Sequence, residues 1–491
     1  MKKINRIILF LLCISLLVSY IPASAEDYSG DAETVAVKSQ QVPFMLANAS
    51  ASIYAPATYQ PSIFNYYAET VLAPCPDAQR FYAAIVEACS RLVIGQYRQV
   101  YTLPQIVVTN ISNRALFEQY MNKVFNCIFT DRPEFFWFYS VSYSYSFSGS
   151  SFLCTITADA SSVFISDDHM GLGRKMMDDA VAEILANKPA GGDTLETMAY
   201  FNDWLCEHNT YCTAAGESGV FQYANTILPA FASNNNETLG PVCQSYAGAF
   251  KHLCNLVGIP CIVVMGVGYT GTGGGAHAWN AIKIDGAWYA NDSTWNDSLD
   301  RWGSHFMVGN QTVTQEWYGT QNIAKFGGSH VAGLLLTTGD EYLDNKYPTL
   351  ATNSYKATLN GKGKATSEGS TIILPLGQYN PENVYSLIEN SSLVTFKKSG
   401  NTIAATGIIP TGATATLAYQ GKTYDTKTIV VRGDLSGDGK ISSLDYIMLK
   451  QYFAGTDYTG NTATACDVNG DGNILTTDYF LLKTYFNGGV Q

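Results

Sequence analysis

Charged residues are scarce in this chain, and basic side chains are fewer than acidic ones. Charged residues make up 14% of the 491 residues, and 29 Lys and Arg stand against 41 Asp and Glu. Binding of nucleic acid or of an anionic membrane requires clusters of basic side chains. The net charge of −12 therefore argues against both partners. An apolar content of 46% indicates a globular chain of about three or four domains.

Long apolar runs are missing beyond the N-terminal segment. That segment has basic side chains at its start, an apolar stretch over residues 7–18 and a small-residue cleavage site at residues 23–25, which is typical of a secretion signal. No later run approaches the roughly 20 apolar residues that cross a bilayer. We therefore predict a signal peptide over residues 1–25, a linker over residues 26–56, and a secreted, extracellular chain without a membrane span.

Cysteine is too sparse for a disulfide scaffold, with 11 residues in the whole chain. Removal of the signal takes away Cys13 and leaves an even number. If one of these is a catalytic thiol, at least one other is unpaired or bonded to another chain. Two pairs are close enough in sequence to bond, namely Cys206 with Cys212 and Cys254 with Cys261, and the sequence alone does not decide their pairing.

Histidine is also rare, with six residues. His305 and His330 lie in WGSHFMVGN and GGSHVAG, and neither has a His four residues away or a neighbouring Cys. Zinc sites in proteins are built from such closely spaced ligands. We therefore expect no zinc site at these histidines.

The stretch over residues 240–297 carries the chemistry of the chain. Its first half reads GPVCQSYAGAFKHLCNLVGIP, with apolar residues at helical spacing after Cys243 and with Gly258 and Pro260 at the end of the helix. A thiol at a helix N-terminus lies beside unpaired backbone N–H groups and the positive end of the helix dipole. Both favour the thiolate, so Cys243 is a candidate nucleophile.

A nucleophilic cysteine also needs a base and a group that orients the base. His277 and Asp292 flank two short apolar runs that are separated by the turn dipeptide Asp285-Gly286. Such runs predict a hairpin, which would place the imidazole and the carboxylate side by side against the helix that carries the thiol. The sequence therefore predicts a triad of Cys243, His277 and Asp292.

The motifs GxVCxxYAxAF, HAWN, DGxWY and DSTWND resemble the transglutaminase-like superfamily of papain-type folds. The resemblance implies a catalytic domain over residues 191–345, with Cys243 as nucleophile, His277 as base and Asp292 as orienting acid. It also implies an oxyanion hole built from the Cys243 backbone N–H and one polar side chain. The candidates for that side chain are Gln222, Asn225 and Thr226. One departure is Gln244, where many relatives have an acidic residue.

Residues 57–190 are predicted to be an α+β region that packs on this core. Helical spacing over residues 76–93 and 113–128 precedes the alternating segment SVSYSYSFSG, which is typical of a strand. The run DRPEFFW at residues 131–137 resembles a segment upstream of the core in secreted bacterial relatives. It implies one wall of the active-site cleft, and a plain hydrophobic plug is the alternative.

Residues 346–431 differ from the core in composition and residue pattern. Short runs rich in Thr, Val and Ile alternate with Gly and Asn turns, and no cluster of residues suggests chemistry. This pattern predicts a small β-sandwich spacer of immunoglobulin-like type.

The tail over residues 432–491 contains two copies of a loop motif, DLSGDGKISSLD and DVNGDGNILTTD, that are 33 residues apart. Each copy has oxygen side chains at the EF-hand loop positions 1, 3, 5 and 12 and a glycine at position 6, where the loop turns sharply. The fit predicts two Ca²⁺ ions. The predicted ligands are Asp434, Ser436, Asp438, the Lys440 carbonyl and Asp445 for the first ion, and Asp467, Asn469, Asp471, the Asn473 carbonyl and Asp478 for the second.

Each loop leads into an apolar helix, YIMLKQYF or YFLLKTYF, without the entering helix of a full EF-hand. The tail therefore resembles a dockerin, an all-α module that binds the cohesin domain of a scaffoldin in cellulosome-type complexes. The cohesin contacts implied by this resemblance are Ser443, Leu444, Lys450, Thr476, Thr477 and Lys483. Leu475 replaces the usual polar residue at position 9 and is expected to weaken the second site. A calcium-stabilised tail without a partner is the alternative.

Together these features predict a multidomain α+β protein and a secreted, cellulosome-associated cysteine enzyme that acts on protein or peptide amides. The reaction is hydrolysis, as in a peptidase or amidase, or transglutaminase-type acyl transfer. Hydrolysis is slightly favoured because no acyl-acceptor site can be identified in the sequence. The alternative is an inert adaptor or binding module that acts through dockerin-mediated assembly in a polysaccharide-degrading complex. A glycan-active enzyme ranks last, since no pair of carboxylates of the glycosidase kind stands out.

Overall fold

The computed structural model describes residues 33–35, 64–92, 100–138, 141–159, 167–213, 224–232, 240–270, 273–297, 305–312, 324–326, 330–332 and 347–488. The predicted signal peptide and the oxyanion candidate Gln222 lie outside these residues. The chain divides into two compact units, Met1–Asn187 with Phe201–Tyr355, and Lys188–Tyr200 with Lys356–Gln491. Within the described segments, no helix has both the length and the apolar character that crossing a membrane requires.

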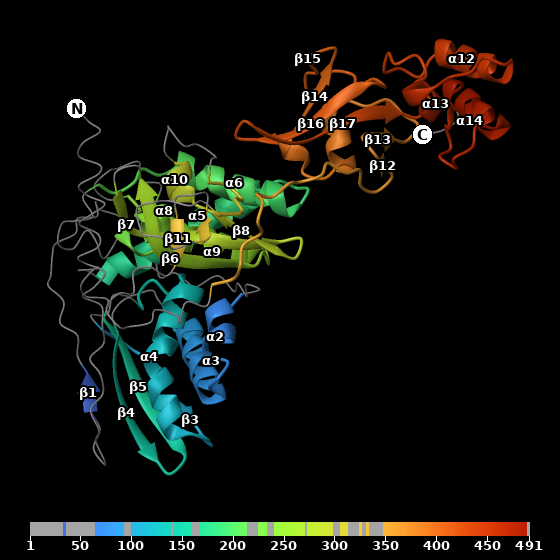
Figure 1. Cartoon of the computed structure of the whole chain (residues 1–491). Coiled ribbons are helices and arrows are strands. Elements are labelled where there is room, and N and C mark those ends of the chain that lie inside the picture. Colours follow the sequence, from blue (N-terminus) through green and yellow to red (C-terminus); the bar gives the residue numbers. More distant parts are fainter. Residues whose placement is uncertain are drawn as a thin grey trace. The chain divides into compact units, whose positions relative to one another are not determined.

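The first unit begins with helices and an antiparallel sheet (Figure 1). The helices are α2 (Tyr66–Thr70), α3 (Pro76–Arg91) and α4 (Arg114–Asp131). The strands pair in the order β1 (Glu33–Val35), β4 (Val141–Ser148), β5 (Ser151–Asp159) and β2 (Val100–Thr102), and β3 (Ile106–Val108) also pairs with β5. The strand predicted from the alternating segment is β4.

Aromatic packing joins these helices to the sheet. Phe152 of β5 lies 5.2 Å from Phe81 of α3 and 4.8 Å from Phe117 of α4, measured between ring centroids, and both contacts are edge to face. All three rings are fully buried. Helix α4 starts where the side chain of Asn113 accepts a hydrogen bond from Leu116 N over 3.0 Å, which satisfies one of the unpaired N–H groups of the first turn.

The second part of the first unit places helices beside a six-stranded sheet. The helices are α5 (Asp167–Asn187), α8 (Leu228–Phe231), α9 (Cys243–Leu256), α10 (Ser293–Asn296) and the second half of α6 (Thr194–Glu207), whose residues up to Tyr200 belong to the second unit. The strands pair in the order β8 (Ala287–Asn291), β7 (Gly273–Ile284), β6 (Cys261–Thr270), β11 (His330–Ala332), β10 (Ala324–Phe326) and β9 (Asn310–Thr312).

Two features of this sheet position the site. The predicted hairpin forms between β7 and β8, with Ile284 opposite Ala287. Its turn residues Asp285 and Gly286 both have positive φ, 50° and 80°, as a two-residue hairpin turn requires. Strand β6 pairs with β7 on one side and with β11 on the other. A residue of β11 is therefore brought close to the hairpin although it is distant in sequence.

A buried lysine connects the N-terminal helices to α9. Lys251 of α9 is fully buried, and its Nζ donates to the carbonyls of Phe64 and Cys261 over 2.9 Å each. The carboxylate of Asp131, at the end of α4, accepts hydrogen bonds from the backbone N–H groups of Tyr67 and Ala68. Residues before position 140 therefore contact the helix that begins at Cys243.

In its described residues, the second unit contains another six-stranded sheet, four complete α-helices and the first residues of α6 (Figure 1). The strands pair in the order β12 (Thr366–Glu368), β13 (Thr371–Leu374), β17 (Lys422–Val431), β16 (Ala413–Tyr419), β14 (Val394–Lys398) and β15 (Asn401–Thr402), and only β13 and β17 are parallel. A sandwich consists of two sheets, whereas these six strands are hydrogen-bonded into one sheet. The predicted sandwich therefore stays a prediction. The helices are α11 (Pro381–Val384), α12 (Ser443–Phe453), α13 (Gly460–Cys466) and α14 (Thr476–Phe486).

One apolar cluster joins the sheet of the second unit to its C-terminal helices. It is made of the buried residues Val430, Leu435, Leu449, Ala465, Cys466, Val468 and Leu482. Since Val430 lies on β17 and Leu449 and Leu482 lie on α12 and α14, the tail packs on the strand that precedes it. Residues 188–200 belong to the same unit, where buried Glu196 accepts hydrogen bonds from the backbone N and the Oγ of Ser392 over 3.1 and 2.9 Å.

Candidate active site

Cys243 is the first residue of α9, as the sequence predicts. Val242 before it has an extended backbone, with φ −100° and ψ 178°, and its carbonyl accepts from the N–H groups of Ser245 and Tyr246. Ten cysteines lie in the described residues, and no disulfide joins them, so neither candidate pair is bonded. Nine of the ten are buried, and Cys243 is half-buried. Among the described cysteines, Cys243 is therefore the thiol that solvent reaches.

His277 and Asp292 are brought together by the hairpin. His277 lies on β7, and Asp292 follows β8 as the N-cap of α10, where its Oδ1 accepts from Trp295 N over 3.2 Å. The Nε2 of His277 lies 2.7 Å from Oδ2 of Asp292, and both side chains are buried. The capping bond and the imidazole bond use different oxygens, so the carboxylate is held from two directions.

The electrostatics of this pair favour the imidazolium. Burial alone would lower the pKa of His277, but the charge of Asp292 and the hydrogen bond to it outweigh burial, and the nearby thiol of Cys243 adds to them. Together they raise the pKa of His277 to about 10. Burial opposes ionisation of Asp292, and His277 and then His330 hold its pKa far below the usual range. Because Nε2 faces Asp292, Nδ1 is the nitrogen left to face the thiol.

His330, at the start of β11, is a residue of this site that the sequence analysis did not assign to it. Its Nε2 lies 2.9 Å from Oδ2 of Asp292, the same oxygen that contacts His277. His330 is fully buried, and its ring centroid lies 5.1 Å from that of His277. No local spacing could reveal it, because 38 residues separate it from Asp292.

His277, Asp292 and His330 are also the group of side chains that could hold a metal ion, among the described His, Cys, Asp and Glu residues. Tetrahedral zinc ligands at about 2.0 Å from the ion lie roughly 3.3 Å from one another. The nitrogen–oxygen distances here are 2.7 and 2.9 Å, which are hydrogen-bond distances. The three groups therefore form a hydrogen-bonded chain in this structure.

Tryptophans surround the histidines. The ring centroid of Trp295 lies 5.2 Å from His277 and 4.3 Å from His330, and that of Trp279 lies 4.8 Å from His330. Trp288, in contrast, packs against Tyr66 at 5.6 Å. Two of the three tryptophans near the predicted triad thus enclose it in apolar surroundings. Such surroundings strengthen the ion pair by excluding water.

A recess opens beside Cys243. Its lining residues come from the end of α4 and the segment after it, from the approach to α8, from α9 and from β6; they are Ile128, Phe129, Thr130, Arg132, Pro133, Phe135, Phe136, Phe138, Asn225, Thr226, Ile227, Gln244, Gly248, Val263 and Met265. Gln244 follows Cys243, and Cys243 and Met265 pack on the same cluster of Ala247, Val263 and Ala278. Four residues of the DRPEFFW segment, Arg132, Pro133, Phe135 and Phe136, line this recess, and so do the two oxyanion candidates Asn225 and Thr226. That the segment forms a wall of an active-site cleft stays a prediction.

The first predicted calcium loop is closed around buried carboxylates. Asp434 Oδ1 accepts from the N–H groups of Gly437 and Asp438 over 3.0 and 3.1 Å, and Asp445 Oδ1 accepts from Ser436 N over 2.9 Å. Gly439, at position 6, has φ +82°, which glycine adopts without strain. Burial raises the pKa of Asp434, and the charge of Asp445 adds to that rise. Two buried carboxylates that repel each other fit a bound cation.

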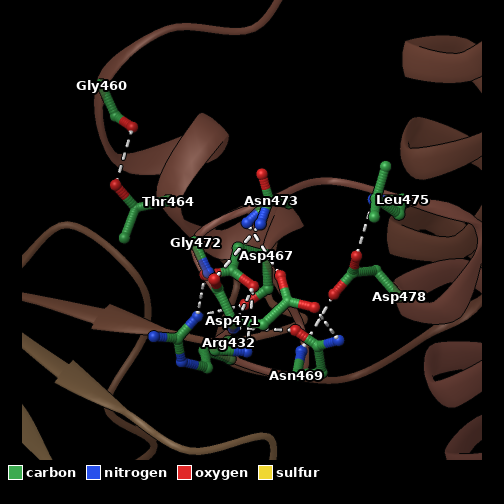
Figure 2. A network of polar contacts seen from close by, with 11 residues as sticks. Arg432, Gly460, Thr464, Asp467, Asn469, Asp471, Gly472, Asn473, Leu475 and Asp478 are labelled. Carbon is green, nitrogen blue, oxygen red and sulfur yellow. Dashed lines mark hydrogen bonds and ion pairs between the residues drawn. The ribbon is translucent and has the colours of Figure 1, made fainter.

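The second loop repeats this geometry (Figure 2). Asp467 Oδ1 accepts from Gly470 N and Asp471 N over 2.9 and 3.1 Å, Asp478 Oδ1 accepts from Asn469 N over 3.0 Å, and Gly472 has φ +83°. In both loops the residue at position 7 donates from its backbone N–H to the Asp at position 5 over 2.8 Å, from Lys440 to Asp438 and from Asn473 to Asp471. The predicted ligands of each ion thus lie in one closed loop.

Two neighbours distinguish the loops. In the first, Asp434 Oδ2 accepts from Thr411 N over 2.7 Å, and Thr411 precedes β16. In the second, Asp467 Oδ2 lies 2.8 Å from Arg432 Nη1, and Arg432 also donates to the Asp467 carbonyl (Figure 2). The repeat predicts neither contact, because Thr411 and Arg432 lie outside both copies.

Comparisons with known proteins agree with the two main resemblances. The model of the transglutaminase-like superfamily matches residues 181–293, and the dockerin type I domain matches residues 432–487. Human kyphoscoliosis peptidase is 31% identical over 131 residues, which are 25% of this chain and 18% of that protein. The mouse kyphoscoliosis peptidase is 31% identical over 105 residues, 20% of this chain and 15% of that protein. The chain thus spans less than a fifth of the length of these relatives.

A solved structure described as a TGase is 17% identical to this chain, with a TM-score of 0.21, and the alignment covers 38% of this chain and 49% of the other. Dockerin domains in general bind calcium and cohesins and belong to extracellular cellulosome components, as the resemblance implies. The predicted domain composition is confirmed: this protein combines a transglutaminase-like domain with a type I dockerin domain.

Proposed function

We propose that this protein is a secreted cysteine enzyme that cleaves protein or peptide amides and is docked through its dockerin into a cellulosome-type complex. The observation that carries the proposal is the 2.7 Å bond between His277 and Asp292, beside the one half-buried cysteine of the described residues. A thiol at a helix N-terminus, an imidazole and an orienting carboxylate are the parts that nucleophilic cysteine catalysis needs.

The proposed reaction has two steps. The Cys243 thiolate attacks the amide carbonyl carbon and forms a C–S bond, and the carbonyl oxygen becomes an oxyanion near the N-terminus of α9. His277, protonated at both nitrogens, gives the Nδ1 proton to the leaving amine as the C–N bond breaks. A water molecule then attacks the thioester and passes a proton to His277, which releases the acid and the thiolate. Asp292 keeps Nε2–H directed toward itself throughout, so Nδ1 remains available for each proton transfer.

Hydrolysis is favoured over acyl transfer to a second amine. The matched human and mouse relatives are named peptidases. The recess beside Cys243 has a mostly aromatic and aliphatic lining, including Phe135, Phe136 and Met265. We propose that it takes an apolar side chain of the acyl-donor peptide, since apolar lining next to the reacting atom selects for such side chains.

The tail and the termini complete the proposal. Residues 1–25 act as the signal peptide, and the spacer over residues 346–431 presents the dockerin. The two loops each hold one Ca²⁺ through the ligands predicted above, and the cohesin lies against α12 and α14. On α12, Leu444 and Ile447 are about half exposed, as are Leu475 and Phe480 in the second copy. Any link to polysaccharide breakdown comes from the enzymes assembled on the same scaffoldin.

A Cys243→Ala variant tests the enzyme. We expect the wild type to hydrolyse a peptide mixture and to be alkylated by iodoacetamide at Cys243 at neutral pH, and the variant to lose both. Incubation with dansyl-cadaverine separates the two reactions, because incorporation of the amine indicates acyl transfer and release of peptides indicates hydrolysis. Unchanged turnover in Cys243→Ala would refute the proposal. Alkylation of the wild type only at the pH of an ordinary thiol would favour the inert adaptor.

A further inference from the structure

We propose that His330 is a positioning residue for the reaction of Cys243, which holds the Asp292 carboxylate in place and so sets the orientation of His277. This inference rests on the proposed function and adds a fourth side chain to it. His330 lies outside the segment that the transglutaminase-like model matches, which ends at residue 293. No motif in the sequence assigns it a role.

The first argument is the geometry around the carboxylate. Oδ2 of Asp292 lies 2.7 Å from Nε2 of His277 and 2.9 Å from Nε2 of His330, and Oδ1 accepts from Trp295 N over 3.2 Å. Three N–H donors therefore surround one buried carboxylate, one from each of β7, β11 and α10. Rotation of the carboxylate would break at least two of these bonds in a buried place, where an unmade bond is costly.

The second argument is the charge state of His330. Burial lowers its pKa, and although Asp292 opposes this, the nearby His277 and His305 add to it, so that the pKa is about 3. His330 is therefore neutral at physiological pH and acts as a hydrogen-bond donor through Nε2–H. A neutral donor fixes the carboxylate without cancelling its negative charge, which remains available to stabilise the His277 imidazolium.

The third argument is the space that the sheet provides. Strand β6 separates the two histidines: Gly266 pairs with His277 on one side, and Gly268 pairs with His330 on the other. A Cβ atom on Gly268 would lie 3.2 Å from both Cβ and Cδ2 of His277 and 3.0 Å from Cζ2 of Trp295. A glycine weakens a central strand because it has no side chain to pack. At Gly268, the absence of a Cβ atom leaves the space in which both imidazoles reach Oδ2 of Asp292.

Among the described residues, Asp292, Cys243 and His330 are titratable groups close to His277, and His305 lies 5.5 Å from His330 between ring centroids. The hydrogen bond from His330 stabilises the negative charge on Asp292. Without that bond the carboxylate attracts the His277 imidazolium more strongly, so His277 should bind its proton more tightly. An imidazolium that releases its proton less readily is a poorer acid toward the leaving amine. The loss of His330 is thus expected to move the titration of His277 upward and to slow turnover.

The test uses the full-length protein with ¹⁵N-labelled histidine, which gives only six imidazoles to assign. In the wild type we expect His330 as the neutral Nε2–H tautomer from about pH 5 to about pH 9. In His330→Phe we expect an upward shift of the His277 titration and a loss of peptide turnover of about tenfold, the effect of one hydrogen bond to a charged group. His330→Gln, whose amide nitrogen reaches the position of Nε2, should restore both.

Two results would overturn the inference. One is a wild-type His330 that is protonated, or present as the Nδ1–H tautomer, at neutral pH; this measurement requires no variant to fold. The other is a His277 titration in His330→Phe that equals that of the wild type, or a His330→Gln variant that behaves like His330→Phe. The NMR titration does not depend on turnover. An inactive wild type with the expected titrations would refute the proposed function. It would leave standing only what the titrations measure, namely that His330 holds the Asp292 carboxylate against His277.

Discussion

The guanidinium of Arg432 donates to Oδ2 of Asp467 over 2.8 Å, which places a fixed positive charge at the first position of the second predicted calcium loop. Arg432 directly follows β17, which ends at Val431, and its side chain is largely buried. A Cβ atom on Gly470 would lie within 3.2 Å of three guanidinium atoms, so the loop backbone is closely packed against the arginine. The corresponding oxygen of the first loop, Oδ2 of Asp434, accepts instead from the uncharged backbone N–H of Thr411.

This difference predicts unequal calcium affinities in the two loops. Arg432→Ala removes a positive charge that repels the calcium ion. It should therefore tighten calcium binding in the second loop by about three- to tenfold. Arg432→Lys keeps the charge and should change the affinity less. Calorimetric titration of Ca²⁺ into the calcium-depleted protein measures both sites, and the first site is the internal reference. Weaker binding in Arg432→Ala would show that the arginine braces the loop more than it repels the ion.

The two glycines at loop position 6 offer a matched pair of variants. Gly439 and Gly472 have nearly equal φ values, +82° and +83°, so alanine introduces the same backbone strain of about 1–2 kcal/mol at each. Their surroundings differ, because a Cβ atom on Gly439 would lie 2.3 Å from Ile408 Cγ2, whereas Gly472 faces open space. Gly439→Ala should therefore lower the unfolding temperature of the tail more than Gly472→Ala in calorimetry. Equal losses would mean that Ile408 moves aside at no cost.

Replacement of the orienting carboxylate should remove most of the activity. In Asp292→Asn an amide can present its N–H to His277 and so favour the tautomer with the proton on Nδ1, which is the wrong one for a base that faces the thiol. We expect turnover to fall by about 10³- to 10⁴-fold with the fold retained. Asp285→Asn is the matched control, because asparagine suits the left-handed turn at φ 50°. A comparable loss in that control would indicate a general effect on the hairpin.

Stability should depend on pH through His277. Its pKa is raised from 6.5 to about 10 in the folded protein, so the folded state binds this proton more tightly than the unfolded chain. The resulting stabilisation is fully present below about pH 6.5 and is lost as the pH rises toward about 10. Urea unfolding of the wild type, followed by tryptophan fluorescence, should therefore show a falling free energy of unfolding over this window. Asp292→Asn should show a shallower fall; parallel curves for the two proteins would contradict the assignment.

A substitution at Gly248 tests the recess beside Cys243. A Cβ atom at this position of α9 would lie 2.7 Å from Ile227 Cγ2 and 3.3 Å from Pro133 Cβ, two atoms of the recess wall. Gly248→Ala should displace Ile227 into the cavity and lower kcat/KM about tenfold for a peptide with a large apolar side chain there, through a steric cost of about 1–3 kcal/mol. A peptide with glycine at that position should be affected much less. Equal losses for both peptides would place the apolar side chain elsewhere.

Much of the site is encoded by residues that are close in sequence. The helix that begins at Cys243, the hairpin turn at Asp285-Gly286 and the two calcium-loop motifs could all be predicted, because capping, turn geometry and ligand spacing depend on only a few neighbouring residues. Helix ends were predicted less well: the helix expected over residues 113–128 is observed as Arg114–Asp131. Its last turn is held by tertiary contacts of Asp131 with Tyr67 and Ala68.

What only the tertiary structure decided is which distant residues meet at these local features. His330 reaches Asp292 because β11 pairs with β6, and Arg432 reaches Asp467 because the tail packs on β17. The recess likewise combines residues near 130 with α9. The order of strands in a sheet depends on the burial of the whole apolar surface and leaves no periodic signal in any one segment. The sequence by itself therefore determined the chemical groups and their local geometry. The packing of the sheets determined which distant side chains, such as His330 and Arg432, lie beside these groups and change their electrostatics.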